Sequence, residues 1–323
     1  MKVRKYFRDC REAGLKTFVR NMVFGRREKD IGLAKLLIYF ILIIIGFIYL
    51  YPLLLMLSTS FKSLDDLIND AVKWIPSELY LENYKQALKV MDFSETLWQT
   101  VALAVIPSLL QVICCCLTGY AISRYRFPGK SAVVAMLILT FVLPKQATML
   151  PTYLLFKQYK IVGTIHAFTL PAALGQGLSA AIITLVFFQF FNQINTSVIE
   201  AAQIDGCGHF RVFFHIALPS VGAAFIIGFL FSLVWYWNET YLTALFVSNT
   251  GLGNTQSMTT LLMELRGFEA SYKLLYQGNE AANKLNEAIR MAGTVLCILP
   301  LLAVYFVLQR YFVQSVDMVG IKE

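Results

Sequence analysis

Long uncharged runs alternate with short polar segments along this chain of 323 residues. A helix of about 20 apolar residues crosses the roughly 30 Å hydrocarbon core of a bilayer, so each such run predicts one membrane span. The predicted spans cover residues 36–57, 100–122, 131–150, 170–192, 216–237 and 291–309. The third is the least regular, because Lys145 interrupts it. The pattern predicts an all-α, polytopic membrane protein with six transmembrane helices.

The composition agrees with a membrane environment. Apolar residues make up 57% of the chain and charged residues 15%, and the mean hydropathy is +0.61. Such values exclude an ordinary globular protein. Because about 35 mostly polar residues precede the first apolar run and no small-residue cleavage site follows it, we expect no cleavable signal peptide.

The charge distribution predicts an orientation in the membrane. Residues 1–35 hold eleven basic side chains and four acids, which accounts for most of the net charge of +8. Basic segments stay in the cytoplasm, so the N-terminal tail is predicted there, and six spans return the C-terminus to the same side. The tail offers no basic face with interleaved aromatic residues, so we interpret it as a segment that contacts anionic lipid and expect no nucleic-acid partner.

The sequence offers little chemistry of its own. Cys114, Cys115 and Cys116 are consecutive and would point in different directions around a helix, which suits packing rather than a metal site. The segment "RYRFPGKS" has Arg124 where a phosphate-binding loop needs glycine. We therefore expect no catalytic residue, no metal, no cofactor and no ATP hydrolysis in this chain.

A polar, glycine-containing segment lies between two strongly apolar runs. We call residues 195–219 the knuckle. In its first half, Ser197 and Glu200 have the spacing of a capping box, which predicts that Ser197 begins a short helix. Gly206 is placed to end that helix in the left-handed conformation.

The second half of the knuckle predicts another short helix. Phe210, Phe213 and Phe214 are spaced to give one apolar face, and Pro219 lies near the start of the next span, where its missing N–H is tolerated. Two short helices joined by glycine would project from the bilayer. The alternative is a tight loop in which Glu200 merely caps a helix.

The knuckle sequence "EAAQIDGCGHFRVFFHIALP" closely resembles the EAA loop of importer permeases of the ATP-binding-cassette class. The residues that carry the likeness are Glu200, Ala201, Ala202, Asp205, Gly206, Phe213, Ile216 and Pro219. Further segments, such as "GYAISRYRFPGK" and "YWNETYLTAL", are similar to the second, six-span permease of the carbohydrate-uptake group, the maltose-type subunit. Asn195 and Ala223 stand where that family usually has proline.

This resemblance implies partners and a location. It implies a sugar importer of the bacterial cell membrane, with residues 36–313 as a transmembrane permease domain between two cytoplasmic tails, 1–35 and 314–323. The partners would be a second permease subunit, two ATP-binding-cassette ATPase subunits and an extracytoplasmic solute-binding protein. The residues expected to dock on the ATPase are Glu200, Ala201, Ala202, Asp205, Gly206, Phe210, Phe213, Phe214 and Pro219.

A second group of residues is a candidate for the substrate pathway. Trp235, Trp237, Asn238 and Glu239 could stack on and hydrogen-bond a sugar, or they could form an aromatic belt at the membrane interface. Two alternatives to an importer subunit remain, a secondary transporter and a structural membrane subunit that transports nothing. A secondary transporter usually has ionisable residues at mid-membrane and internal repeats, which this sequence does not display.

Overall fold

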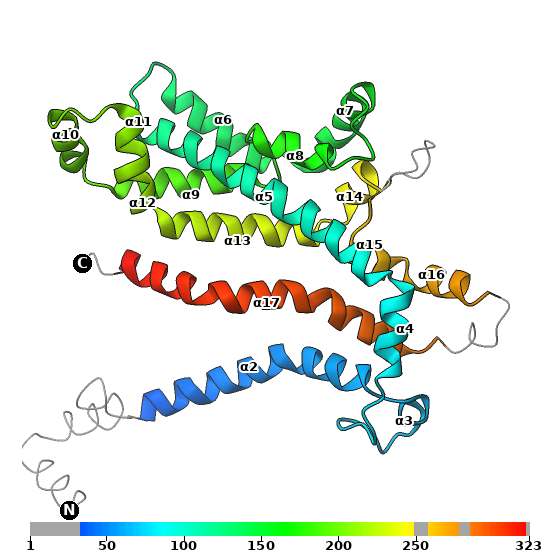
Figure 1. Cartoon of the computed structure of the whole chain (residues 1–323). Helices are drawn as coiled ribbons and strands as arrows, with labels where there is room; N and C mark the ends of the chain where they lie inside the picture. Colours follow the sequence, from blue (N-terminus) through cyan, green and yellow to red (C-terminus); the bar gives the residue numbers. More distant parts are fainter. Residues whose placement is uncertain (1–32, 249–257, 278–284, 321–323) are drawn as a thin grey trace, which may run out of the picture. The chain divides into compact units, whose positions relative to one another are not determined.

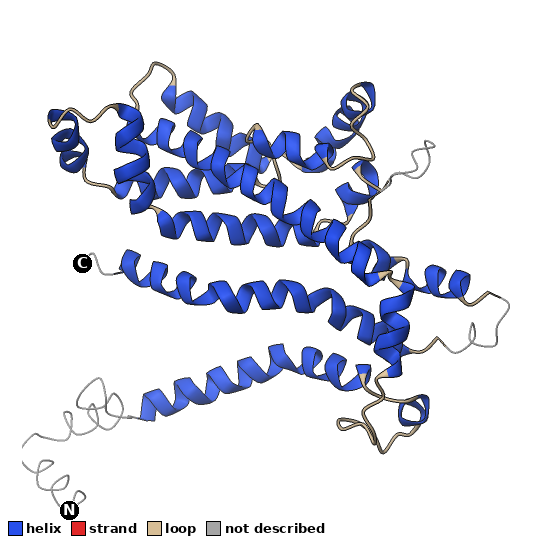
Figure 2. Cartoon of the chain, in the orientation of Figure 1, coloured by secondary structure: helices blue, strands red, loops and turns tan. Residues whose placement is uncertain are grey.

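The computed structural model describes residues 33–248, 258–277 and 285–320. All the regular structure in these ranges is helical (Figure 2). The chain divides into two compact units, Met1–Tyr80 and Leu81–Glu323. An all-α fold is therefore confirmed for the part of the chain that the structure describes.

The first unit contains the long helix α2 (Leu33–Ser60) and the short helix α3 (Leu64–Ile68). No residue in the most apolar stretch of α2 is buried within the structure, so lipid or another protein must cover it. The segment after α2 is held by polar contacts. The ammonium of Lys62 donates to the carbonyls of Val72 and Lys73, at 2.9 and 3.0 Å, and Ser77 N–H donates to Asp66 at 3.1 Å.

The second unit is a helical bundle in which α5 contacts α8, α9 and α13 (Figure 1). Figure 1 shows the knuckle helices α10 and α11 at one end of this unit and α14, α15 and α16 toward the other. Its helices are α4 (Glu82–Val90), α5 (Phe93–Arg124), α6 (Lys130–Val142), α7 (Lys145–Gln158), α8 (His166–Ala173), α9 (Ala180–Gln193), α10 (Thr196–Ile204), α11 (His209–Val212), the π-helix η1 (Phe213–Ala217), α12 (Leu218–Ser220), α13 (Gly222–Asn238), α14 (Tyr241–Phe246), α15 (Leu261–Arg266), α16 (Phe268–Leu275) and α17 (Glu287–Gly320).

Within the described residues, three of the candidate spans are continuous helices. These are α2, α5 and α17, each long and apolar enough to cross a bilayer. Three further candidates are bent pairs: α6 with α7 at 95°, α9 with α10 at 70°, and the α11–α12 segment with α13 at 73°. Six spans result if each bent pair counts as one.

The predicted third span, residues 131–150, is not one helix. Helix α6 ends at Val142, and α7 begins at Lys145 after Pro144. Proline disfavours the helical conformation in the residue before it and lacks an N–H to donate, so the helix breaks here. The predicted fourth span, residues 170–192, also contains a break, because a turn at residues 174–179 separates α8 from α9.

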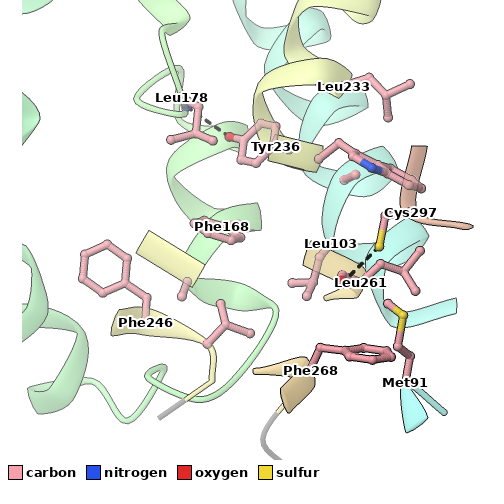
Figure 3. Close-up of a cluster of buried hydrophobic side chains, with 14 of the residues drawn as sticks. Met91, Leu103, Phe168, Leu178, Leu233, Tyr236, Phe246, Leu261, Phe268 and Cys297 are labelled. Atoms are coloured by element: carbon pink, nitrogen blue, oxygen red, sulfur yellow. Dashed lines mark hydrogen bonds between the residues drawn. The ribbon is translucent and has the colours of Figure 1, made fainter. Parts of the chain in front are cut away.

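Two apolar clusters hold the second unit together. The larger one joins α4, α5, α8, α13, α15, α16 and α17 and includes Met91, Leu103, Phe268 and Cys297 (Figure 3). The smaller one lies between α5, α9, α13 and η1 and includes Phe187 and Phe191. Because η1 belongs to this second cluster, the base of the knuckle is fixed to the bundle.

Candidate functional site

The first knuckle helix, α10, begins at a different residue from the one that its sequence predicts. The N-cap is Asn195, whose side-chain oxygen accepts a hydrogen bond from Ser197 N–H at 3.1 Å. The predicted capping box of Ser197 and Glu200 is therefore wrong. Asparagine is at least as good an N-cap as serine, and it comes two residues earlier, so the helix starts there. Glu200 is exposed, and no ion pair within the described residues engages it.

The end of α10 confirms the predicted role of Gly206. This glycine has a φ of +85°, in the left-handed region. Cys207 N–H donates to the Ala202 carbonyl at 2.9 Å and Gly206 N–H donates to the Gln203 carbonyl at 3.0 Å. Both bonds together make a Schellman motif, which pairs carbonyls that a helix end otherwise leaves open. Helix α10 thus stops abruptly.

The second arm of the knuckle consists of α11, the π-helix η1 and α12. Its three phenylalanines do not share one face, contrary to the prediction. Phe213 is buried, with its ring centroid 4.8 Å from that of Tyr120, whereas Phe210 and Phe214 are 83% and 56% exposed. The α-helical spacing behind the prediction does not hold through this arm, because the π-helix η1 begins at Phe213.

Other residues of the knuckle are exposed although Phe213 is buried. Ile204 at the end of α10 is 86% exposed, more than any other large apolar residue of the knuckle. Sequence reasoning missed Ile204, although an isoleucine directly before a helix-ending turn is a usable signal. Ala202 is half-buried and Pro219 is exposed. We define the docking face as the exposed residues Glu200, Ala201, Ile204, Asp205, Phe210 and Phe214.

Arg124, at the end of α5, fastens the start of the knuckle to the bundle. Its guanidinium donates to the carbonyls of Phe191 and Ile194, the latter at 2.8 Å. These carbonyls belong to the C-terminal turn of α9, directly before Asn195. Nothing in the sequence pattern predicts this role for Arg124. A cation beside the last carbonyls of a helix stabilises that helix end.

A closed set of hydrogen bonds holds the turn between α8 and α9. The side-chain amide of Gln111 donates to the Leu178 carbonyl at 2.8 Å and to the Ser232 hydroxyl at 3.2 Å. The Tyr236 hydroxyl donates to Gln111 at 2.9 Å. It also accepts from Leu178 N–H at 3.2 Å (Figure 3). Irregular backbone at membrane depth requires such partners.

The four candidate pathway residues do not come together around a cavity. Trp235 stacks on Phe231, with centroids 5.8 Å apart, and Trp237 is buried in the larger apolar cluster. Asn238 donates to a carbonyl of its own helix. The Glu239 carboxylate accepts from Tyr241 N–H and from the following N–H, each at 3.0 Å, and so caps α14.

The same region does contain a cavity of about 370 Å³. Parts of α6, α7, α8, α13, α14 and the turn before α9 line it, and Tyr236 is the residue that α13 contributes. Tyr236 lies one residue from each of the two tryptophans, on a different side of the helix. The lining residue of α13 is thus a sequence neighbour of the predicted pathway residues, and none of those four lines this cavity.

Comparison with known proteins settles the family. Residues 111–318 match the family described as the inner membrane component of binding-protein-dependent transport systems. The match extends over more than half of the chain and includes the whole knuckle. The chain belongs to this family.

The known proteins that this chain resembles are named as permease proteins. It is 27% identical over 300 residues to the probable starch degradation products transport system permease protein AmyC of Thermoanaerobacterium thermosulfurigenes, covering 91% of this chain and 100% of AmyC. It is 27% identical over 285 residues to the arabinooligosaccharides transport system permease protein AraQ of Halalkalibacterium halodurans, covering 86% and 93%. It is 29% identical over 291 residues to the sn-glycerol-3-phosphate transport system permease protein UgpE of Rhizobium meliloti, covering 86% and 95%.

A solved structure agrees with the fold. A chain of a bacterial ATP-binding-cassette transporter, involved in the import of the acidic polysaccharide alginate, aligns with a TM-score of 0.66. The alignment covers 86% of this chain and 95% of that chain at 21% identity. The protein is thus a multi-pass membrane component of a binding-protein-dependent transport system. This family fits the importer interpretation and neither of the two alternatives.

Proposed function

We propose that this chain is a permease subunit that couples a carbohydrate pathway to a separate ATPase through the knuckle. It works with a second permease subunit, two ATPase copies and an extracytoplasmic solute-binding protein, and it hydrolyses no ATP itself. The carbohydrate class is supported by relatives that carry starch degradation products and arabinooligosaccharides. The relatives also include transporters for sn-glycerol-3-phosphate and for the acidic polysaccharide alginate, so they leave the charge of the cargo open.

The observation that carries the proposal is the exposure of Ile204 and Phe210. Both side chains are more than four-fifths exposed, and they lie on the two arms of a segment that projects from one end of the bundle. Large apolar side chains beside acids on such a projection are typical of a protein interface. Glu200 would pair there with a basic residue of the ATPase.

The connections at the base of the knuckle support its role as a lever. A partner shifts a conformational equilibrium only through contacts that differ between the two states, so closure of the ATPase must push on something that transmits force. Phe213 anchors one arm in the smaller apolar cluster, and Arg124 holds the other arm at the end of α9. Movement of the docking face must therefore move α9 and α13.

The proposal fixes an orientation. The knuckle must face the cytoplasm, where ATP is available, and the basic tail of residues 1–35 lies on the same side of the bacterial cell membrane.

The Schellman turn, and not the side chain of Glu200, determines the shape of α10. A change at Glu200 therefore tests docking without removing a helix cap.

The deciding experiment is Glu200→Lys in the assembled importer. Because like charges at an interface cost several kcal/mol, we expect sugar uptake and co-purification of the ATPase to fall at least about tenfold while the amount of the chain in the membrane stays the same. Gln193→Lys, which places the same side chain on an exposed position outside the docking face, is the control and should retain both activities. Normal uptake by Glu200→Lys would rule out docking through this face.

A further inference from the structure

The cavity in the second unit has an unusual set of polar groups. Its wall is largely apolar and includes Phe168, Phe246 and Tyr236 from three different helices (Figure 3). The polar lining residues are the hydroxyl-bearing Thr140, Thr148, Thr152, Ser179 and Tyr236, the amide of Gln176, and one charged side chain, Lys145. No carboxylate belongs to the lining. A volume of about 370 Å³ is within the range of small-molecule sites.

Lys145 has no counter-ion of its own in the described part of the chain. None of the ion pairs found there includes it. Glu239 is close in sequence to the lining residues Tyr236 and Leu242, but its carboxylate accepts two backbone hydrogen bonds at the start of α14 and does not line the cavity. Lys145 is exposed in this chain, and an ionisable residue in a membrane-embedded segment usually has a partner or a function.

The position of Lys145 makes the cavity more positive. Lys145 is the first residue of α7, and the helix α9 begins at Ala180, which also lines the cavity. The N-terminus of a helix carries a partial positive charge, so a lysine there is repelled by its own helix. Neither helix start has a side-chain cap. The first residues of two helices and one lysine thus line the same cavity, and an anion there would interact favourably with all three.

The hydroxyl groups suit the rest of a carbohydrate. Thr148 and Thr152 donate their hydroxyl protons to carbonyls of α7, at 3.1 and 2.7 Å. Their oxygens remain acceptors for the hydroxyl groups of a sugar. The side chain of Gln176 has no hydrogen bond within the described residues and is exposed to the cavity region as both donor and acceptor.

We propose that this cavity binds the anionic group of a charged carbohydrate cargo, with Lys145 as its counter-ion. The inference rests on the proposed function and adds the charge of the substrate to it. A carboxylate of a uronic acid and a phosphate ester share the required chemistry. Half-helices whose N-termini point at an anionic substrate group are a known arrangement in transporters.

The experiment uses the complete importer reconstituted in proteoliposomes with its solute-binding protein. Uptake is measured for digalacturonate, for neutral galactobiose of the same length, and for glycerol 3-phosphate. We expect uptake of at least one anionic probe and not of galactobiose. Uptake of the uronate or of the phosphate identifies which anion the site accepts.

Variants of Lys145 then test the site itself. Loss of a charge-assisted contact should lower uptake of the anionic probe at least about tenfold in Lys145→Gln, whereas Lys145→Arg should retain most of it. Lys157→Gln, on the same helix but outside the lining, is the matched control and should behave like the natural protein.

Each other outcome overturns the inference. If galactobiose is the one probe imported, the cargo is not anionic, and the proposed function still holds. If Lys145→Gln takes up the anionic probe as well as the natural protein does, the anion does not bind at Lys145. An equal loss of all transport in Lys145→Gln and Lys145→Arg, with failure to co-purify the second permease, would mean that Lys145 pairs with that subunit. Failure to import any carbohydrate would contradict the proposed function as well.

Discussion

Gly206 illustrates how a single residue sets the geometry of the docking face. A Cβ added at Gly206 would meet no atom within 4 Å, so space does not require glycine there. The requirement comes from the backbone, whose φ of +85° costs about 1 to 2 kcal/mol for a residue with a side chain. The end of α10, and the direction of Ile204 beside it, depend on that conformation.

We therefore expect Gly206→Ala to weaken coupling and Gly206→Val to weaken it more, because β-branched residues adopt positive φ least readily. Gly206→Asn should retain most of the activity, since asparagine tolerates the left-handed region. The measurement is ATPase activity stimulated by the loaded solute-binding protein. Gly208→Ala is the control, because Gly208 has a φ of −69° and equally open surroundings. Equal effects at both glycines would contradict the Schellman assignment.

Gly177 is a residue that steric contact does require. A Cβ at Gly177 would overlap the side-chain oxygen of Gln111 and the hydroxyl of Tyr236, and it would lie 3.1 Å from the Ala172 backbone. Gly177→Ala should separate the hydrogen-bonded groups and leave at least one of them unpaired, at a cost of about 1 to 3 kcal/mol.

The measurement for Gly177→Ala is the thermal unfolding temperature of the purified complex in detergent, which should fall. Gly222→Ala, at the first residue of α13 with no atom within 4 Å of the added Cβ, should leave it unchanged or raise it slightly. A Gly177→Ala protein as stable as the natural one would show that the turn can move away from Gln111.

Among elements, the connection from α9 to α10 determines whether the knuckle acts as a lever. Arg124 spans this connection by binding the last carbonyls of α9. Arg124→Gln should free the start of α10, so hydrogen exchange at the amides of residues 194–198 should quicken and uptake should fall at least about fivefold. Arg126→Gln removes the same charge from an exposed neighbour and should change neither. Unchanged exchange in Arg124→Gln would remove Arg124 from the lever.

The same elements show what the sequence could and could not predict. Uncharged length is sufficient to place α2, α5 and α17, because solvation by lipid depends on composition alone. A glycine at position 206 is sufficient to predict the left-handed backbone conformation that ends α10. Asn195 and Arg124 escaped prediction because their roles depend on distances between segments: a cap competes with its neighbours for the same N–H groups, and a guanidinium finds carbonyls about 70 residues away.

A hydropathy pattern also does not predict the breaks between α6 and α7 and between α8 and α9. Pro144 and the glycines near Gly177 signal breaks, but not whether the chain continues across the bilayer or turns back. Only the partners of the unwound backbone, such as Gln111 from a distant helix, make the second break stable. Those partners are ordinary polar residues in the sequence.

For the whole molecule, the bend between α6 and α7 decides the topology. If this pair crosses the bilayer, the knuckle and the basic tail lie on one side and α16 lies on the other. If it turns back, the chain crosses the bilayer one time fewer before the knuckle, and the knuckle then lies on the side without ATP. Six spans place the loop of residues 249–287 outside. In that loop, Ser257 and Asn283 lie outside the described residues, whereas Gln277 is described and exposed.

We expect a cysteine at Gln277 to react with an impermeant thiol reagent in intact cells. Native Cys207, which is half-buried behind Gly206, should react only after the membrane is opened and the ATPase is removed. A Cys207→Ser background separates the two signals. Labelling of Cys207 from outside, with Gln277→Cys protected, would contradict the orientation and the coupling role together.

The π-helix η1 makes the length of the knuckle as important as its sequence. Phe213–Ala217 hold one wide turn between Phe210 and α13. Each residue of an α-helix turns the chain by about 100°, so one residue inserted or deleted between Phe210 and Gly222 would rotate Phe210 away from its place relative to α13. A substitution in this segment keeps the number of residues between Phe210 and α13, whereas a single-codon insertion or deletion changes it. We expect related permeases with active transport to vary in the residues of this segment and to keep their number.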